Sequence, residues 1–116
     1  MKIIITGGRE FTDYALLKRK CDIYLSNIRE DIVIVSGMAR GTDMLGVTYA
    51  VEKAYEILPF PANWDKYGKG AGFIRNKDMA KIADYAIAFW DGQSRGTCHM
   101  IQTMCGLSKP IKVVRY

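Results

Sequence analysis

Short, largely apolar runs alternate with amphipathic segments along the whole chain. The runs are Lys2–Thr6, Ile32–Val35, Glu56–Phe60, Asp84–Phe89 and Pro110–Arg115. They have the length and the side chains of buried β-strands. Strands that are apolar on both faces must be covered on both sides, and a helix between successive strands does so as a right-handed crossover over a parallel sheet. The pattern predicts an α/β fold, a three-layer Rossmann-like sandwich with a mainly parallel sheet of about five strands.

Four helices and one long loop are expected between these strands. The stretch Ala62–Gly72 has no periodicity, and a connection of this length is often a lid or a binding loop. Elsewhere, apolar residues recur at helical spacing behind residues that can cap a helix. Two of the expected helices are capped by Thr12 or Asp13 and by Thr42 or Asp43, and the other two cover Gly72–Ala83 and Gly96–Cys105.

The expected strand order, 3-2-1-4-5, indicates where a ligand should bind. In open sheets of this kind, ligands bind beyond the carboxyl ends of the strands, at the point where the order reverses. The turns after Lys2–Thr6 and after Asp84–Phe89 occupy that point. Binding residues are therefore expected in these two turns first.

Length and composition limit the class of protein. With 116 residues, the chain is expected to form one domain over residues 1–116. Its 49% hydrophobic and 25% charged residues are typical of globular proteins and exclude disorder. No apolar run approaches the roughly 20 residues of a membrane helix, and the apolar start is too short for a secretory signal. Three cysteines without CxxC spacing suit a reducing compartment, so a cytoplasmic protein without a membrane partner is expected.

Three glycine-containing turns follow strands and open helices. They are Gly7-Gly8-Arg9, Ser36–Asp43 and Asp91–Thr97. Glycine lets the backbone approach a ligand closely, and free amides at a helix start attract an anion such as phosphate. Each turn also has an arginine, which binds phosphate in bidentate fashion, and the net charge of +5 favours an anionic partner. The alternative is that α/β turns need glycine in any case and that the arginines are only solvated.

The segment Asn63–Met79 combines aromatic, basic and amide side chains, which suits a base and a phosphate. An exposed Trp64 or Trp90 can stack on a nucleobase, and Asn76 can bind its edge. The alternative for each tryptophan is packing under a loop or at a subunit interface. The residues expected to bind a ligand are Gly8, Arg9, Gly37, Arg40, Gly41, Asp43, Trp64, Arg75, Asn76, Trp90, Asp91, Gly92, Ser94, Arg95, Gly96 and Thr97.

Catalytic and metal-binding residues are sparse. GxGxxG does not follow a strand and GxxxxGK[ST] is absent, which disfavours NAD dehydrogenases and P-loop NTPases. His99 is the only histidine, its neighbour Cys98 points elsewhere on a helix, and no metal-ligand spacing occurs, so neither a metal nor a cofactor is expected. Asp43 and Asp91 are candidates for binding ribose hydroxyls, and helix capping is the alternative role for both.

Four ordered motifs cover nearly the whole chain. They are GGREFTD at 7–13, SGMARGTD at 36–43, PANWDKYGKGAGFIRNKDM at 61–79 and ADYAIAFWDGQSRGT at 83–97. Together they resemble the YspA-like, cpYpsA-related branch of the SLOG superfamily. The resemblance implies a Rossmann-like domain related to the LOG phosphoribohydrolases, which cleave nucleoside 5′-monophosphates, and to the DNA-processing protein DprA. It also implies binding of nucleotides or ADP-ribose-like molecules, in some members as sensors of nucleotide signals in immunity against phage.

The resemblance assigns roles to individual residues. Asp91–Thr97 resembles the phosphate-binding PGGxGT turn of the LOG enzymes, and 75–79 resembles their RKxxM segment, whose arginine, here Arg75, is catalytic. The essential glutamate of the LOG pattern GTxxE is replaced by Met100, which cannot act as a general base. The resemblance therefore favours binding over hydrolysis, with Arg75 and Asp91 as the candidate catalytic residues.

The sequence leaves three functions open. The first is a module that binds a nucleotide or an ADP-ribose-derived small molecule, to sense or to sequester it. The second is a LOG-like nucleotide N-glycosidase in which Asp43, Asp65 or Asp91 replaces the glutamate. The third is DprA-like nucleic-acid binding, for which a solvated helix face beside the pocket is the alternative. A homo-oligomer is expected because so short a chain makes a shallow pocket. The basic and aromatic residues of the third function are Lys66, Tyr67, Lys69, Phe73, Arg75, Lys77 and Lys81.

Overall fold

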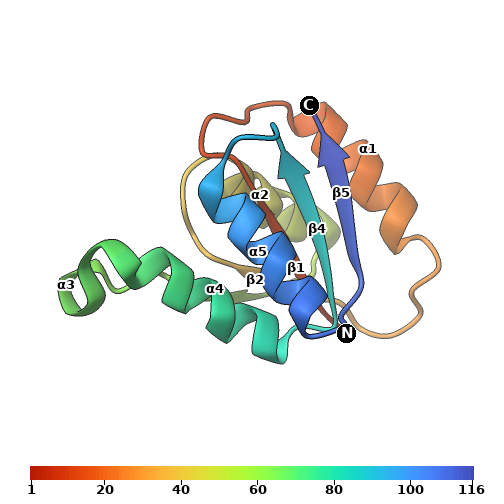
Figure 1. Ribbon diagram of the computed structural model, residues 1–116. Coiled ribbons are helices and arrows are strands. Elements are labelled where there is room, and N and C mark those ends of the chain that lie inside the picture. Colours follow the sequence, from red (N-terminus) through yellow and green to blue (C-terminus); the bar gives the residue numbers. More distant parts are fainter.

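The sheet of the protein consists of five strands, all parallel. The strands are β1 (Lys2–Gly7), β2 (Val33–Ser36), β3 (Glu56–Pro59), β4 (Tyr85–Trp90) and β5 (Ile111–Arg115). The computed structural model describes residues 1–116 and gives the strand order β3-β2-β1-β4-β5 (Figure 1). This Rossmann-like order confirms the prediction and places β1 at the point where the order reverses.

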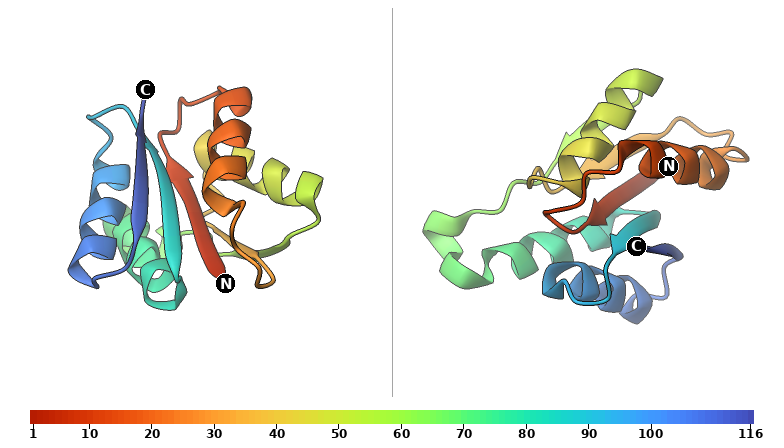
Figure 2. Two further views of the ribbon diagram at one scale, coloured as in Figure 1. Left: turned by 90° about the vertical axis from the view of Figure 1, so that its right-hand side faces the viewer. Right: turned by 90° about the horizontal axis from the view of Figure 1, so that it is seen from above.

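Helices cover both faces of the sheet and give the expected three layers. The helices are α1 (Tyr14–Leu25), α2 (Thr42–Lys53), α3 (Trp64–Tyr67), α4 (Ala71–Ile82) and α5 (Arg95–Gly106), and a 3-10 turn, η1 (Gly68–Gly70), joins α3 to α4. α1 and α2 pack on one face of the sheet, and α4 and α5 pack on the other (Figure 2). None of the helices combines the length and the apolar character that crossing a bilayer requires.

Successive residues of β1 enter the two cores of the molecule. Ile3 and Ile5 pack toward α1 and α2, whereas Ile4 packs with Met79 and Met100 toward α4 and α5. All five side chains are buried. Truncation of such a side chain to alanine costs about 2–5 kcal/mol. The sheet is therefore a firm base for the turns at its carboxyl edge.

The starts of α1 and α2 are made in different ways. Asp13 caps α1 as predicted, because its Oδ1 accepts a backbone N–H of the first turn at 3.0 Å. α2 has no side-chain cap. Its N-cap residue is Gly41, at φ +79°, so the prediction of a cap at Thr42 or Asp43 was wrong. The Thr42 hydroxyl instead donates to the carbonyl of Gly8 at 2.9 Å and ties α2 to the turn after β1.

The stretch Ala62–Gly72, expected to be a loop, is largely helical. Asn63 caps α3 by accepting the N–H of Lys66 at 3.1 Å, and η1 leads directly into α4. Neither α3 nor η1 buries a residue, so no apolar stripe marks them in the sequence. Figures 1 and 2 show these residues, 63–70, extending away from the sheet, and we call them the projecting segment.

Candidate functional site

A cleft of about 390 Å³ opens beyond the carboxyl ends of β1 and β4. It lies where the strand order reverses, which is the usual ligand position on such sheets. Segments far apart in the chain line it, from the turn after β1 to the start of α5. The predicted ligand residues that line it are Gly8, Arg9, Asp43, Trp64, Arg75, Asn76, Asp91, Ser94, Gly96 and Thr97.

Six of the predicted residues lie outside the lining of this cleft. Arg40 forms an exposed ion pair with Glu10. Trp90 donates its Nε1–H to the carbonyl of Ser94 at 3.1 Å, and the Arg115 guanidinium lies over its ring. Trp90 thus supports the turn before α5, which agrees with packing under a loop. The other four are Gly37, Gly41, Gly92 and Arg95.

Several lining residues were not assigned to the ligand site from the sequence. Thr6 is next to the last residue of β1 and Tyr116 follows β5. Parallel strands bring both to the same edge, so strand polarity could have indicated them. Lys69 and Phe73 were considered only for the nucleic-acid alternative and not for the cleft. The lining residues missed are Thr6, Gly7, Glu10, Ala39, Lys69, Gly72, Phe73 and Tyr116.

The N-terminus of α5 presents free N–H groups at the cleft. Ser94 caps the helix by accepting one N–H of the first turn at 3.4 Å, whereas the N–H groups of Arg95 and Gly96 have no acceptor in the protein. The start of α2 differs, because the carbonyl of Gly8 accepts both the N–H and the hydroxyl of Thr42, at 3.2 and 2.9 Å. The first two N–H groups of α5 are therefore free donors for an anion beside the cleft.

Arg75 and Asn76 tie three segments together at the cleft. Arg75 donates from Nη1 to the Gly37 carbonyl at 2.6 Å and from Nε to Asn76 Oδ1 at 3.2 Å. Asn76 Nδ2 donates to the Gly96 carbonyl at 3.1 Å and lies 3.3 Å from Nδ1 of His99. Position 37 must be glycine for this approach, because a Cβ there would lie 2.5 Å from Arg75 Nη1. Both side chains are thus held in place without a ligand.

Asp43 places an almost fully buried carboxylate in the wall of the cleft. The residue is 6% exposed, its Oδ2 accepts the N–H of Ala39 at 3.2 Å, and its Oδ1 accepts no hydrogen bond from the protein. Burial raises the pKa of Asp43 to about 6, although the Ala39 N–H and the charges of Arg75 and Arg9 oppose this shift. Neither arginine forms an ion pair with it. At neutral pH, the carboxylate in the cleft wall is therefore ionised and has one oxygen without a protein donor.

An aromatic ring and a guanidinium form the outer side of the cleft. The Arg9 guanidinium lies 5.8 Å from the ring centroid of Trp64, within the range of cation–π contact. Half of Trp64 remains exposed. The ring therefore has surface left on which a planar group can stack.

The two positions that the resemblance connects with acid–base chemistry, 91 and 100, offer no buried carboxylate. Asp91 Oδ1 accepts the N–H groups of Ser94 and Gln93, both at 2.8 Å, and these bonds hold the pKa of Asp91 below its usual range. Met100 is fully buried in the core beneath α4 and α5 and does not face the cleft. Asp43 is the lining carboxylate that is both buried and free on one oxygen. No group of three or more His, Cys, Asp or Glu residues is placed to hold a metal ion.

The sequence matches a known family over its first half. Residues 1–67 match the model of the family described as "YspA, cpYpsA-related SLOG family". The chain belongs to this family. The gene 61 protein of Mycobacterium phage D29 is 31% identical to this SLOG-family chain over 107 residues, which cover 87% of the chain and 86% of that protein. The matched residues include the turns after β1 and β2. The helices α4 and α5 and the turn between β4 and α5 lie beyond residue 67.

The fold of this SLOG-family chain is also that of a DNA processing protein. DNA processing protein A from Helicobacter pylori, described for its single-stranded DNA binding mode, superposes with a TM-score of 0.69 at 21% sequence identity. The superposition covers 100% of this chain and 66% of the other, so this chain spans less than two thirds of that protein's length. At such identity the likeness establishes the fold.

Proposed function

We propose that the cleft binds a nucleotide or an ADP-ribose-derived small molecule. One observation carries this proposal. A helix N-terminus with free N–H groups and two arginines without ion-pair partners lie together at the point where the strand order reverses. A phosphate at the start of α5 accepts the N–H groups of Arg95 and Gly96 and is favoured by the helix dipole. Arg9 and Arg75 supply the charge that neutralises it.

The other end of the ligand is defined by Asp43 and Trp64. An ionised carboxylate repels phosphate but accepts a hydrogen bond from a hydroxyl, so Asp43 supports the binding of a ribose hydroxyl. Asp91 is a weaker candidate for that role, because its Oδ1 is engaged by its own turn. The half-exposed ring of Trp64 suits a nucleobase. Phosphate, ribose and base together describe a nucleotide.

Holding the ligand is better supported than cleaving it. Position 100, at which the LOG enzymes have their essential glutamate, is a methionine within the core. Binding needs only the donors and charges described above. We therefore propose a sensor or a sequestering module, and a nucleotide immune signal is the ligand class that the SLOG resemblance suggests.

Calorimetric titration tests the proposal with matched glycine variants. Wild-type protein is titrated with ADP-ribose, AMP and adenosine, of which the last lacks phosphate. A Cβ at Gly96 or at Gly106 meets no atom within 4 Å, and both residues belong to α5, but only Gly96 lines the cleft. Gly96→Val keeps the backbone N–H but places a branched side chain in the cleft, where it blocks the approach of phosphate. The lost hydrogen bonds should weaken binding of the phosphorylated ligands by about tenfold or more. Gly106→Val should bind as wild type, and no binding of any phosphorylated ligand to wild type would refute the proposal.

A LOG-like N-glycosidase is the second candidate, and the state of Asp43 favours it. A carboxylate with a pKa of about 6 in a cleft is typical of residues that act in catalysis. Incubation of AMP or ADP-ribose with the protein should then release free adenine, detected by chromatography, and Asp43→Asn should abolish the release. Intact nucleotide after prolonged incubation contradicts this candidate and leaves the binding proposal unaffected.

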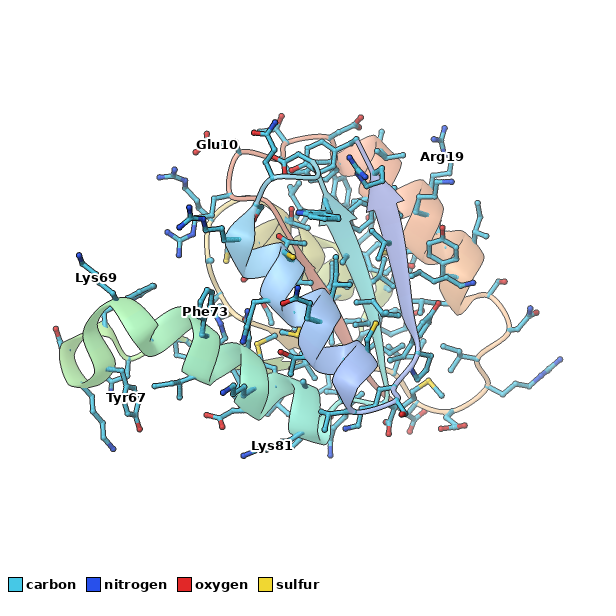
Figure 3. All side chains as sticks on the ribbon, in the orientation of Figure 1. Glu10, Arg19, Tyr67, Lys69, Phe73 and Lys81 are labelled. Atoms are coloured by element: carbon cyan, nitrogen blue, oxygen red, sulfur yellow. The ribbon has the colours of Figure 1, made fainter.

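Nucleic-acid binding is a third candidate, suggested by the charge of +5 and by the DNA processing protein with the same fold. The basic and aromatic residues do not form one stripe, however. Figure 3 shows Lys69 and Phe73 pointing to one side of the projecting segment and α4, and Tyr67 and Lys81 pointing to the other. Oligonucleotide binding that falls steeply with salt would support this candidate, because phosphate contacts release counterions.

Self-association is proposed for the exposed apolar residues around the projecting segment. Trp64, Tyr67, Phe73 and Ile74 are each more than a third exposed. Exposed apolar side chains on both sides of a projecting segment are candidates for contact with a second copy of the chain. Light scattering of the purified protein distinguishes a dimer from a monomer.

A further inference from the structure

We propose that His99 is a positioning residue of the cleft, whose neutral ring keeps Asn76 and Arg75 in the arrangement that binds an anion. His99 does not line the cleft but contacts Asn76 from α5. The inference takes its ligand from the proposed function and its geometry from the hydrogen bonds around Asn76. It concerns a residue to which neither the sequence motifs nor the proposed function gives a role.

The orientation of the Asn76 carboxamide is dictated by two partners that cannot change roles. Arg75 Nε can only donate, so the atom that faces it at 3.2 Å must be the Asn76 oxygen. The Gly96 carbonyl can only accept, so the atom that faces it at 3.1 Å must be the Asn76 nitrogen. The second N–H of that nitrogen is directed at His99, 3.3 Å away. The amide therefore presents a donor to the histidine in every protonation state of the imidazole.

His99 fits this arrangement in one protonation state only. Nδ1 must accept, so it has no proton, and the neutral ring has its proton on Nε2. The surroundings favour the same state, because burial and then the charge of Lys77 on α4 lower the pKa of His99. The ring of Phe73, also on α4, stacks on the imidazole with centroids 4.3 Å apart, and no carboxylate forms an ion pair with it. Two positive charges thus oppose protonation of His99. One is Lys77, and the other is Arg75, which is linked to the imidazole through Asn76.

Protonation of His99 breaks the chain of hydrogen bonds at the cleft. The new Nδ1–H meets the N–H of Asn76, and two donors at 3.3 Å repel. If the amide turns over to accept from His99, its nitrogen faces the Nε–H of Arg75 instead. If the imidazole moves away, the stack with Phe73 is lost. The first outcome removes a hydrogen bond of Arg75, and the second leaves Asn76, the partner of Arg75, less firmly held, so acidification should weaken anion binding.

NMR of the only histidine tests this inference with wild-type protein. ADP-ribose is the probe, because its diphosphate diester has no ionisation near pH 6, unlike a phosphate monoester. By linkage, a ligand that prefers the neutral ring must lower the pKa of His99 on saturation. A bound anion that acted only through its charge would raise that pKa. The expected result is a fall in the pKa, with affinity about fivefold weaker at about pH 5.5 than at about pH 7.5, and a rise in the pKa would overturn the inference.

Two substitutions separate positioning from simple packing. His99→Leu removes the acceptor and should weaken ADP-ribose binding across the pH range. His99→Asn retains an acceptor near the place of Nδ1 but does not titrate, so it should restore most of that affinity. The titration of Asp43 affects both proteins equally, so it cancels in the ratio of wild-type to His99→Asn association constants. This ratio should fall as the pH is lowered. A ratio that stays constant would contradict the role of His99.

The geometry can also be tested without a ligand. The Nε–H signal of Arg75 should be protected from exchange at neutral pH and lose protection as His99 titrates. In His99→Asn the protection should persist through the same range. If ADP-ribose fails to bind but these signals behave as stated, the proposed function is wrong and the positioning role of His99 stands. If Arg75 is insensitive to the titration of His99, the positioning role is wrong.

Discussion

Two regions of the molecule are rich in charged groups, and they differ in how these groups are paired. Between α1 and α2, each acidic side chain is bound by both a tyrosine hydroxyl and a lysine. The contacts are Glu52 with Tyr14 and Lys18, and Asp22 with Tyr49 and Lys53. Bonds of this kind join two helices and add to stability in the manner of other charge-assisted hydrogen bonds.

The cleft has charged groups of both signs that form no ion pairs with one another. Arg9, Arg75 and Asp43 all line it, and burial disfavours the charged forms of Arg75 and Asp43. Ionised groups that are buried without full pairing cost stability. The ligand proposed above would pair both kinds of charge, because it supplies an anion and a hydroxyl. The contrast shows that the charges of the cleft differ from those between α1 and α2 in being unpaired, and unpaired buried charges favour this cleft as the candidate site.

Removal of Arg75 should produce the largest effect on binding. Arg75→Met should weaken ADP-ribose binding by about 30-fold or more, because a charged hydrogen bond to phosphate contributes about 2 kcal/mol or more. Calorimetric titration measures this loss. Lys18→Met, which removes a cation from the paired region, is the control and should bind as wild type. Equal losses in both variants would erase the distinction between the two regions.

Substitution of Asp43 and Asp22 should change stability in opposite directions. The folded-state pKa of Asp43 is raised to about 6, so between about pH 4 and 6 the folded chain binds more protons than the unfolded chain, and stability falls as the pH rises through that window. Asp43→Asn should therefore raise the free energy of unfolding at neutral pH by about 1–2 kcal/mol. It should also weaken ADP-ribose binding. Urea unfolding followed by circular dichroism measures the change in stability.

Asp22 provides the matched comparison for Asp43. The Tyr49 hydroxyl, followed by Lys53, lowers the pKa of Asp22, so its ionised form stabilises the fold at neutral pH and this stabilisation is lost as the pH falls through its folded-state pKa. Asp22→Asn should lower stability at neutral pH and leave ligand affinity unchanged. If Asp43→Asn also destabilises the protein, the claim that the buried, ionised Asp43 carboxylate lowers stability is wrong.

The smallest effect is expected from Tyr49→Phe. The ring is fully buried and its hydroxyl donates to Asp22 at 2.7 Å, whereas Lys53 remains to pair with the carboxylate. Loss of this one bond should cost about 1 kcal/mol in the free energy of unfolding. ADP-ribose affinity should not change, and a change measured by titration would mean that the α1–α2 region is coupled to the cleft.

The strands and their order could be predicted because burial on both faces leaves continuous apolar runs such as Ile3–Ile5. Parallel strands with helical crossovers then fix which turns meet at the carboxyl edge. The helical nature of the projecting segment could not be predicted, because a single turn that buries nothing has no periodicity. The role of Gly41 at the start of α2 depends on a positive φ that the sequence did not reveal.

Within the site, some residues could be predicted from the glycine turns alone, whereas the place of others depends on tertiary contacts. Gly8, Gly96 and Thr97 follow from the turns themselves. Trp90 lies at the end of a strand and precedes a glycine turn, as a base-stacking residue would. Its indole N–H donates to the Ser94 carbonyl, however, and this contact depends on the conformation of the turn.

The central claim is that a phosphorylated ligand binds at the start of α5, and amide NMR during an ADP-ribose titration tests it most directly. The largest shifts should occur at the N–H groups of Arg95 and Gly96, with smaller ones around Asp43 and none around Tyr14 or Glu52. An absence of shifts at saturating ADP-ribose, or shifts confined to the α1–α2 region, would contradict the claim.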